Sequence, residues 1–211
     1  MNIQDEMDRI YRDKPLDDIP WVQNDPPRIL ADLVESGMIA PCPTADLGCG
    51  AGGYAVWLAR KGFKVTGFDC SGEAISHAEG LASEQGLPCR FEVADLTRPL
   101  DIHQPQFDFV YHWALLHHLF PEHRQAFAGN VERMLKPGGK HLCMCFSEED
   151  TGFEGSGKYR KTPLGTTLYF SSEQEIRDLF EPGFRNLDLY TTEIPGKHSP
   201  HSAVVAWMEK S

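Results

Sequence analysis

The sequence predicts an α/β fold built on a mostly parallel sheet with helices on both faces. Three observations predict it. Strand and helix patterns alternate through the chain, a glycine-rich turn follows the first strand pattern, and two strand patterns joined by a short turn close the chain. The 211 residues suffice for one sizeable core. We therefore expect an N-terminal arm or lid over residues 1–25 and a single domain over residues 26–211.

The N-terminal part begins with the arm, which is polar apart from Tyr11 and Trp21. Residues 25–37, "DPPRILADLVESG", predict a helix, with Asp25 able to cap it and prolines suited to its first turn. The apolar stripe of this helix comprises Ile29, Leu30, Leu33 and Val34. Two strands with helices after them follow, and then a third strand. The strands are expected at 44–47, 64–69 and 89–96, and the helices at 54–61 and from the capping Ser71 to about Gln85.

The second half continues the alternation. Strands are expected at 107–113 and 140–147, and the helix at 121–135 is followed by Pro137, Gly138 and Gly139. A Gly- and Lys-rich insert covers residues 147–170. Ser172 and Glu175 have the spacing of a capping box and open another helix. The last two strands, 184–194 and 202–210, are joined by "PGKHSPH" as a hairpin.

The glycine-rich turn, Gly48 to Gly53, has the pattern G-x-G-x-x-G. Glycines between a strand and a helix let a ligand approach the backbone, although the pattern also occurs in turns without a ligand. Asp46 lies just before it and would repel the pyrophosphate of a dinucleotide. A carboxylate there suits the ammonium group of S-adenosylmethionine, whose carboxylate suits the helix N-terminus. Asp46 could instead cap a helix or face solvent.

Two further acids end the next two strands. Asp69 can accept hydrogen bonds from ribose hydroxyls, which does not separate NAD from S-adenosylmethionine. Asp95 can accept a hydrogen bond from an adenine amino group, while the backbone N–H of Leu96 can donate one to a ring nitrogen. Parallel strands end at one edge of a sheet, where ligands bind. The three acids therefore predict one nucleotide site.

The motifs "ADLGCGAGGYAVWLARKGFKVTGFDCS", "FEVADL", "FDFVYHWALLHHL" and "VERMLKPGGK" together resemble class I S-adenosylmethionine-dependent methyltransferases, over residues 44–180. The resemblance implies a Rossmann-like three-layer α/β sandwich whose seven strands follow the order 3-2-1-4-5-7-6, with strand 7 antiparallel. It implies cofactor contacts at Asp46, Gly48, Gly50, Asp69 and Asp95, and at the neighbouring backbone positions Cys49, Cys70, Leu96 and His112.

The arm is similar to that of the thiopurine, thiol and tellurite methyltransferase group in the stretch "DIPWVQNDPPRILADLVESG". In that group the Pro-Trp segment covers the cofactor and the substrate is small. The Asn/Asp-Pro-Pro-aromatic tetrad of amide and adenine N-methyltransferases is absent, because residues 111–114 read Tyr-His-Trp-Ala. This departure disfavours those substrates.

The composition of the chain limits the kinds of partner and the location that we expect for this protein. The net charge of −11 disfavours nucleic acid, and no apolar run is long enough to cross a bilayer. The charged N-terminus lacks a signal-peptide core, and the six scattered cysteines predict reduced thiols, so a cytoplasmic location is expected. The alternating His141, Cys143 and Cys145 could ligate zinc, but a buried strand is the simpler interpretation and no metal is expected. The oligomeric state stays open.

The favoured function is methyl transfer to a small cytosolic molecule, either an anion or a thiol. Alternatives are an NAD-dependent oxidoreductase and a non-catalytic protein that binds S-adenosylmethionine. If the acceptor must lose a proton, His112 and His118 are the candidate bases. The expected substrate-facing residues come from the arm, from the turn after the fourth strand, from the insert and from the last connection; they are Tyr11, Trp21, Trp113, Tyr159, Arg160, Lys197, His198 and His201. The arm is expected either to close over the cofactor as a mobile lid or to stay docked.

Overall fold

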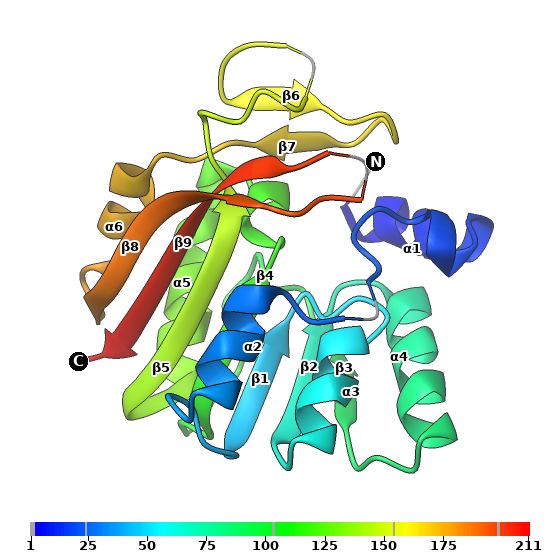
Figure 1. Ribbon diagram of the computed structural model, residues 1–211, viewed down its shortest axis with the longest axis vertical. Coiled ribbons are helices and arrows are strands. Elements are labelled where there is room, and N and C mark those ends of the chain that lie inside the picture. Colours follow the sequence, from blue (N-terminus) through cyan, green and yellow to red (C-terminus); the bar gives the residue numbers. More distant parts are fainter. Residues whose placement is uncertain (1–2, 24, 103, 154, 198) are drawn as a thin grey trace. The chain divides into compact units, whose positions relative to one another are not determined.

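A computed structural model describes residues 3–23, 25–102, 104–153, 155–197 and 199–211. Figure 1 shows the helices and strands of the chain. The chain divides into two compact units. The first comprises Met1–Asp95 and Phe107–Phe109, and the second comprises Leu96–Gln106 and Val110–Ser211. Among the described residues, no helix combines the length and the apolar character that a membrane span requires.

Seven strands form one sheet in the order β3-β2-β1-β4-β5-β9-β8. The pairs β1–β2 and β2–β3 are parallel, whereas β9 runs antiparallel to both β5 and β8. Two short strands, β6 and β7, form a separate antiparallel pair. When only the strands of the main sheet are counted, this is the order 3-2-1-4-5-7-6 with strand 7 antiparallel. The fold class predicted from the sequence is therefore confirmed.

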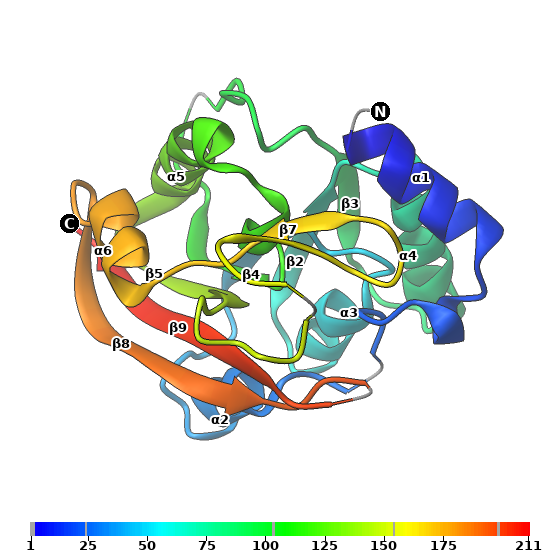
Figure 2. The same cartoon turned by 90° about the horizontal axis from the view of Figure 1, so that it is seen from above.

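The first unit contains the N-terminal half of the alternation. Helices α3 and α4 pack on β2, and α1 packs against α4 (Figure 2). The side chains that these helices bury are apolar. They are Ala55, Val56 and Leu58 of α3 and Ala74, Ile75 and Ala78 of α4. The elements are α1 (Ile3–Asp13), the 3-10 turn η1 (Leu16–Asp18), α2 (Arg28–Glu35), β1 (Pro43–Leu47), α3 (Gly53–Arg60), β2 (Lys64–Asp69), α4 (Gly72–Glu84) and β3 (Arg90–Val93).

The second unit contains the remaining elements. Helix α5 packs on β5, and α6 packs on β8 and β9. The capping box predicted at the start of α6 is confirmed, because Ser172 and Glu175 each bond the other's backbone N–H. The elements are η2 (Leu116–His118), α5 (Pro121–Met134), β5 (Leu135–Phe146), β6 (Tyr159–Lys161), β7 (Thr167–Tyr169), α6 (Glu173–Phe180), β8 (Phe184–Ile194) and β9 (His201–Lys210). Strand β4 (Phe107–Trp113) has residues in both units.

Two local predictions were wrong. Asp25 does not cap the second helix, because α2 begins at Arg28 and Pro27 occupies its N-cap position without a side-chain cap. The strand predicted at 140–147 begins earlier, at Leu135, so Pro137–Gly139 follow the end of α5 as predicted but lie within β5. Gly138 has a φ of 74°, a conformation that glycine adopts without strain, so the chain passes from helix to strand without a separate loop.

Two elements were not anticipated. The arm contains helix α1, whose buried face is formed by Met7, Ile10 and Tyr11. Their i, i+3, i+4 spacing is the sequence signal that predicts such a helix. The insert also holds a short hairpin, β6–β7. Strands of three residues are too short to show a clear alternation, which explains why the sequence pattern did not reveal them.

Candidate functional site

The glycine-rich turn connects β1 to α3 in the first unit. The backbone N–H groups of Gly48 and Cys49 donate to the Phe68 carbonyl at 2.7 and 3.1 Å, which holds the turn against the end of β2. The N–H of Gly50 donates to Asp69 Oδ2 at 2.9 Å. Gly48, Gly50 and Gly52 all have φ between 53° and 80°, so the turn needs glycine at these positions.

Asp69 accepts hydrogen bonds from two backbone segments. Its Oδ1 accepts from the Ser71 N–H at 2.9 Å while its Oδ2 accepts from Gly50. Burial raises the pKa of this carboxyl, and the two N–H donors oppose the shift. Each carboxylate oxygen can accept more than one hydrogen bond, so the same group can still accept from a ligand hydroxyl.

The three acids predicted from the strand ends lie near the glycine turn. Asp46 is buried in β1, and its charge, with that of Asp69, adds to burial in raising the pKa of Cys49. The charges of Asp69 and Asp95 similarly contribute to raising the pKa of Cys70 to about 12, after burial. Asp95 lies two residues beyond the end of β3 and is exposed. Negative charge therefore gathers around this turn and favours a ligand with a cationic group there.

The arm docks onto the glycine turn. A Cβ atom at Gly50 would lie 2.6 Å from the hydroxyl oxygen of Tyr11, so the tyrosine directly covers that glycine. Trp21 Nε1 donates to the Tyr11 hydroxyl at 2.9 Å, and the two rings meet edge to face. Asp8 accepts from Ser71 Oγ at 2.6 Å and from the Glu73 N–H at 3.3 Å, which fixes α1 to the start of α4.

Leu96 and His112, also predicted as cofactor neighbours, belong to the second unit. The Leu96 carbonyl accepts from Asn130 Nδ2 at 3.2 Å. The His112 ring is fully buried between Phe127 and His141, at centroid distances of 5.2 and 5.3 Å. Neither ring nitrogen of His112 has a hydrogen-bond partner within the part of the chain that the structure describes.

Burial also governs the basicity of the two candidate bases. It lowers the pKa of His112 well below its usual range and lowers the pKa of His118 to about 4. Both imidazoles are therefore neutral at pH 7 and are weaker bases than an exposed histidine.

The predicted substrate-facing residues of the second unit have different environments. Tyr159 is 54% exposed and meets Phe120 edge to face, and Trp113 is partly buried at the end of β4. Arg160 is buried, and its guanidinium donates to the carbonyls of Gly157 and Glu148 and, by a short contact, of Asp150. It therefore holds the insert together. His198 lies outside the described residues.

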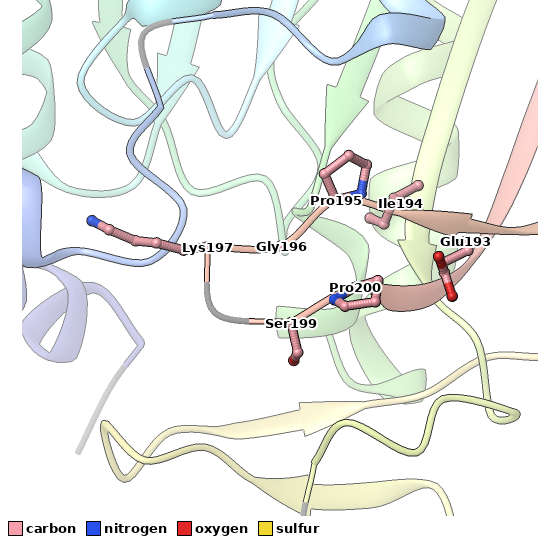
Figure 3. Close-up of a pocket in the computed structure, with 7 residues that line it drawn as sticks. All are labelled: Glu193, Ile194, Pro195, Gly196, Lys197, Ser199 and Pro200. Atoms are coloured by element: carbon pink, nitrogen blue, oxygen red, sulfur yellow. The ribbon is translucent and has the colours of Figure 1, made fainter.

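Lys197 and the β8–β9 connection line a pocket of about 470 Å³ (Figure 3). The Lys197 side chain extends away from the other lining residues in this view. His201 follows directly after the lining residue Pro200 and is the first residue of β9. Its Nδ1 lies 3.2 Å from Asp150 Oδ2. No sequence pattern distinguishes Asp150, because it stands among the exposed acidic neighbours Glu148 and Glu149.

The cysteines do not form disulfides or an apparent metal centre. All six are free. His141 Nδ1 lies 2.9 Å from the Val110 carbonyl, and Cys143 and Cys145 are buried in β5. Across the described ranges, no three histidine, cysteine or acidic side chains are arranged to hold a metal ion.

Residues 45–139 match the family model described as "Methyltransferase domain". This segment of the chain is similar to a methyltransferase domain. The match begins within β1 and includes the glycine turn, Asp69 and Asp95. Together with the strand order, it confirms the resemblance to class I methyltransferases.

Individual relatives agree with this assignment. A 2-heptyl-1-hydroxyquinolin-4(1H)-one methyltransferase from Mycobacteroides abscessus is 28% identical over 152 residues, which are 70% of this chain and 66% of that protein. A probable thiol methyltransferase 2 from Arabidopsis thaliana is 28% identical over 129 residues, which are 60% of this chain and 56% of that protein. The matched segments thus span less than two thirds of these relatives' own lengths.

The fold extends beyond the matched domain. A solved structure described as "Conversion of a Disulfide Bond into a Thioacetal Group during Echinomycin Biosynthesis" superposes with a TM-score of 0.83 at 25% identity. The superposition covers 100% of this chain and 93% of that one. The similarity therefore includes the N-terminal arm and the closing strands as well as the methyltransferase domain.

Proposed function

We propose that this protein transfers the methyl group of S-adenosylmethionine to a small cytosolic molecule. The observation that supports it most directly is the grouping of Asp46, Asp69 and Asp95 around the glycine turn. In this proposal Asp69, which already accepts from the Gly50 N–H, would also accept from ribose hydroxyls, and the buried Asp46 would supply the negative charge that suits the ammonium group. The methyltransferase domain supports the same cofactor.

The charge around the turn disfavours the NAD alternative. A pyrophosphate over Gly48–Gly53 would lie close to a buried Asp46 and to Asp69, and both interactions are repulsive. The net charge of −11 similarly disfavours nucleic acid as the methyl acceptor. Six free cysteines agree with a reducing compartment.

For the acceptor we propose a hydroxyl- or thiol-bearing small molecule. One relative is named for an N-hydroxyquinolone and another for thiols. An overall anionic acceptor is also part of the proposal, and Lys197, at the pocket between β8 and β9, is the exposed cation that would attract it. Arg160 contributes less directly, because its guanidinium holds the insert through backbone carbonyls.

Isothermal titration calorimetry tests the cofactor. Wild-type protein is expected to bind S-adenosylmethionine and S-adenosylhomocysteine and not NADH. Asp69→Asn should weaken S-adenosylmethionine binding about 10- to 100-fold, because hydrogen bonds to a charged group each contribute about 1.5–3 kcal/mol. The control is Asp32→Asn on the exposed face of α2, which should bind as wild type does. NADH binding alone would refute the proposal, and cofactor binding without transfer to any acceptor would indicate a sensor.

A further inference from the structure

Asp8 of α1 caps the first turn of α4 from a different helix of the first unit. Its Oδ1 accepts from Ser71 Oγ at 2.6 Å and from the Glu73 N–H at 3.3 Å. Ser71 is itself the N-cap residue of α4, and its Oγ accepts from the Ala74 N–H at 3.1 Å. A carboxylate at this place satisfies a backbone N–H that the helix leaves without a partner, and its charge complements the helix dipole. The start of α4 therefore depends on two side chains, one of which belongs to the arm.

Ser71 connects two carboxylates through hydrogen bonds. Its hydroxyl donates to Asp8, and its backbone N–H donates to Asp69 Oδ1 at 2.9 Å. The other oxygen of Asp69 accepts from the Gly50 N–H at 2.9 Å. A hydroxyl group has one hydrogen to donate, so the bond to Asp8 fixes its orientation while a lone pair accepts from Ala74. A chain of hydrogen bonds thus runs from the arm to the acid that we assign to the ribose.

Among the polar contacts between α1 and α4, the one to Asp8 is better shielded from water than the Arg12–Glu73 ion pair. Arg12 Nε donates to Glu73 Oε1 at 3.0 Å, but both side chains are exposed, so this pair contributes little to stability. Apolar side chains of the arm also pack against α4 (Figure 2). The buried members of this cluster are Met7, Ile10, Tyr11, Ile19 and Ala74. These apolar contacts remain when the Asp8 bonds are removed, so such a variant should stay folded.

The docked arm encloses Asp69. Tyr11 follows Asp8 by three residues, so both lie on the same side of α1. The Tyr11 hydroxyl lies where a Cβ atom at Gly50 would come within 2.6 Å of it, and the charge of Asp69 adds to burial in raising the pKa of Tyr11. Asp69 is 8% exposed. Hydrogen bonds are stronger where water is excluded, so Asp69 should bind a hydroxyl group more tightly while the arm is docked.

We infer that Asp8 is a positioning residue for cofactor binding, because it holds Ser71 and the arm around Asp69. This inference rests on the proposed function. Asp8 itself does not touch the cofactor in this arrangement. It acts through Asp69, whose carboxylate it keeps oriented and shielded from water. Affinity for the ribose part of the cofactor therefore depends on a residue of the arm that lies outside the glycine turn.

Calorimetry with S-adenosylhomocysteine tests the role of Asp8. Asp8→Ala should bind this ligand about 5-fold more weakly, the factor that corresponds to the loss of one helix cap. Asp8→Asn should retain most of the affinity, because the amide oxygen can accept from the same two donors. The matched control is Asp5→Ala, which removes an exposed acid of the same helix and should bind as wild type does. Wild-type affinity in Asp8→Ala would overturn the inference, as would an equal loss in Asp8→Asn.

A double-mutant cycle tests whether Asp8 acts through Asp69. In protein that already carries Asp69→Asn, the further change Asp8→Ala should alter the affinity for S-adenosylhomocysteine by less than about 2-fold, because the acid that Asp8 positions is gone. Two losses that multiply in full would show that Asp8 acts independently of Asp69, and the inference would be wrong.

An analogue of S-adenosylhomocysteine that lacks both ribose hydroxyl groups gives an independent readout. Wild-type protein and Asp8→Ala should bind this analogue with nearly equal affinity, because the hydroxyl groups that Asp69 would bind are missing. A purely structural role of Asp8 would weaken the binding of both ligands by the same factor. Equal losses with the two ligands would therefore contradict the positioning role.

Further controls separate this inference from misfolding and from the proposed function. Thermal unfolding of Asp8→Ala should remain cooperative. If that variant does not fold, Asp8→Glu takes its place in all three measurements, because it keeps the charge and moves the carboxylate away from its two donors. Wild-type protein that does not bind S-adenosylhomocysteine would refute the proposed function and this inference with it. Wild-type binding that Asp8→Ala leaves unchanged would refute the inference alone.

Discussion

The hydroxyl group of Tyr11 accepts a hydrogen bond from Trp21 Nε1 at 2.9 Å and at the same time covers Gly50 of the glycine turn. Burial raises the pKa of this hydroxyl, and the charge of Asp69 raises it further, so the group stays protonated and can donate. The arm thus brings a neutral donor next to the acid that we assign to the ribose. Cofactor binding and arm docking are therefore expected to depend on each other.

A methyl group at Gly50 should disrupt this relationship. Gly50→Ala places a Cβ atom 2.6 Å from the Tyr11 hydroxyl oxygen at a φ of 53°. We expect weaker cofactor binding and faster proteolysis of the arm. The matched control is Gly37→Ala, which has a φ of 76° and open space around it, and should show only the strain of about 1–2 kcal/mol. Equal effects on cofactor affinity would show that the contact with Tyr11 is unimportant.

The arm is expected to respond to the cofactor. Tyr11 and its neighbours in α1 are buried, so the arm is docked in this structure. If the arm is a lid, S-adenosylhomocysteine should slow proteolytic cleavage within residues 1–25, and Trp21→Phe should reduce this protection because the hydrogen bond to Tyr11 is lost. Identical cleavage rates with and without the ligand would favour permanent docking.

Acid should destabilise the folded protein. Burial lowers the pKa of His141 to about 4, whereas the unfolded chain has an ordinary histidine pKa of about 6.5. Between these values the unfolded state binds more protons, so stability falls as the pH falls from about 6.5 toward 4, by about 3 kcal/mol for one such group. Urea unfolding at pH 7.5 and 5 measures this, and His141→Phe should reduce the difference. An unchanged difference in that variant would contradict this origin.

The two cations assigned to the substrate should act differently. Arg160→Gln removes guanidinium bonds to Gly157, Glu148 and Asp150, so we expect a lower melting temperature, with each lost bond worth about 1 kcal/mol or more. Lys197→Gln should leave the melting temperature unchanged and raise KM for an anionic acceptor, because Lys197 is exposed at the pocket. An Arg160→Gln variant as stable as wild type would show that these bonds are dispensable.

Much of the fold could be predicted because its signals are local. The bounds of β2 and β4, the Ser71 cap and the Ser172–Glu175 capping box all agree with the sequence patterns. Each depends on residues within one turn or one strand, where hydrophobic period and capping chemistry act. The short hairpin of the insert escaped because its strands have only three residues each.

The sequence by itself determined the alternation of strands and helices in the main sheet, the glycine turn and the acids near the strand ends. Only the tertiary structure decided which distant groups meet. Asp150 and His201 are 51 residues apart, and Asp8 and Ser71 are 63 apart. Such pairs have no local period, because chain reversal and burial bring them together. For the same reason, Arg160 resembles a substrate-binding cation in the sequence, whereas in the folded chain backbone carbonyls surround its guanidinium.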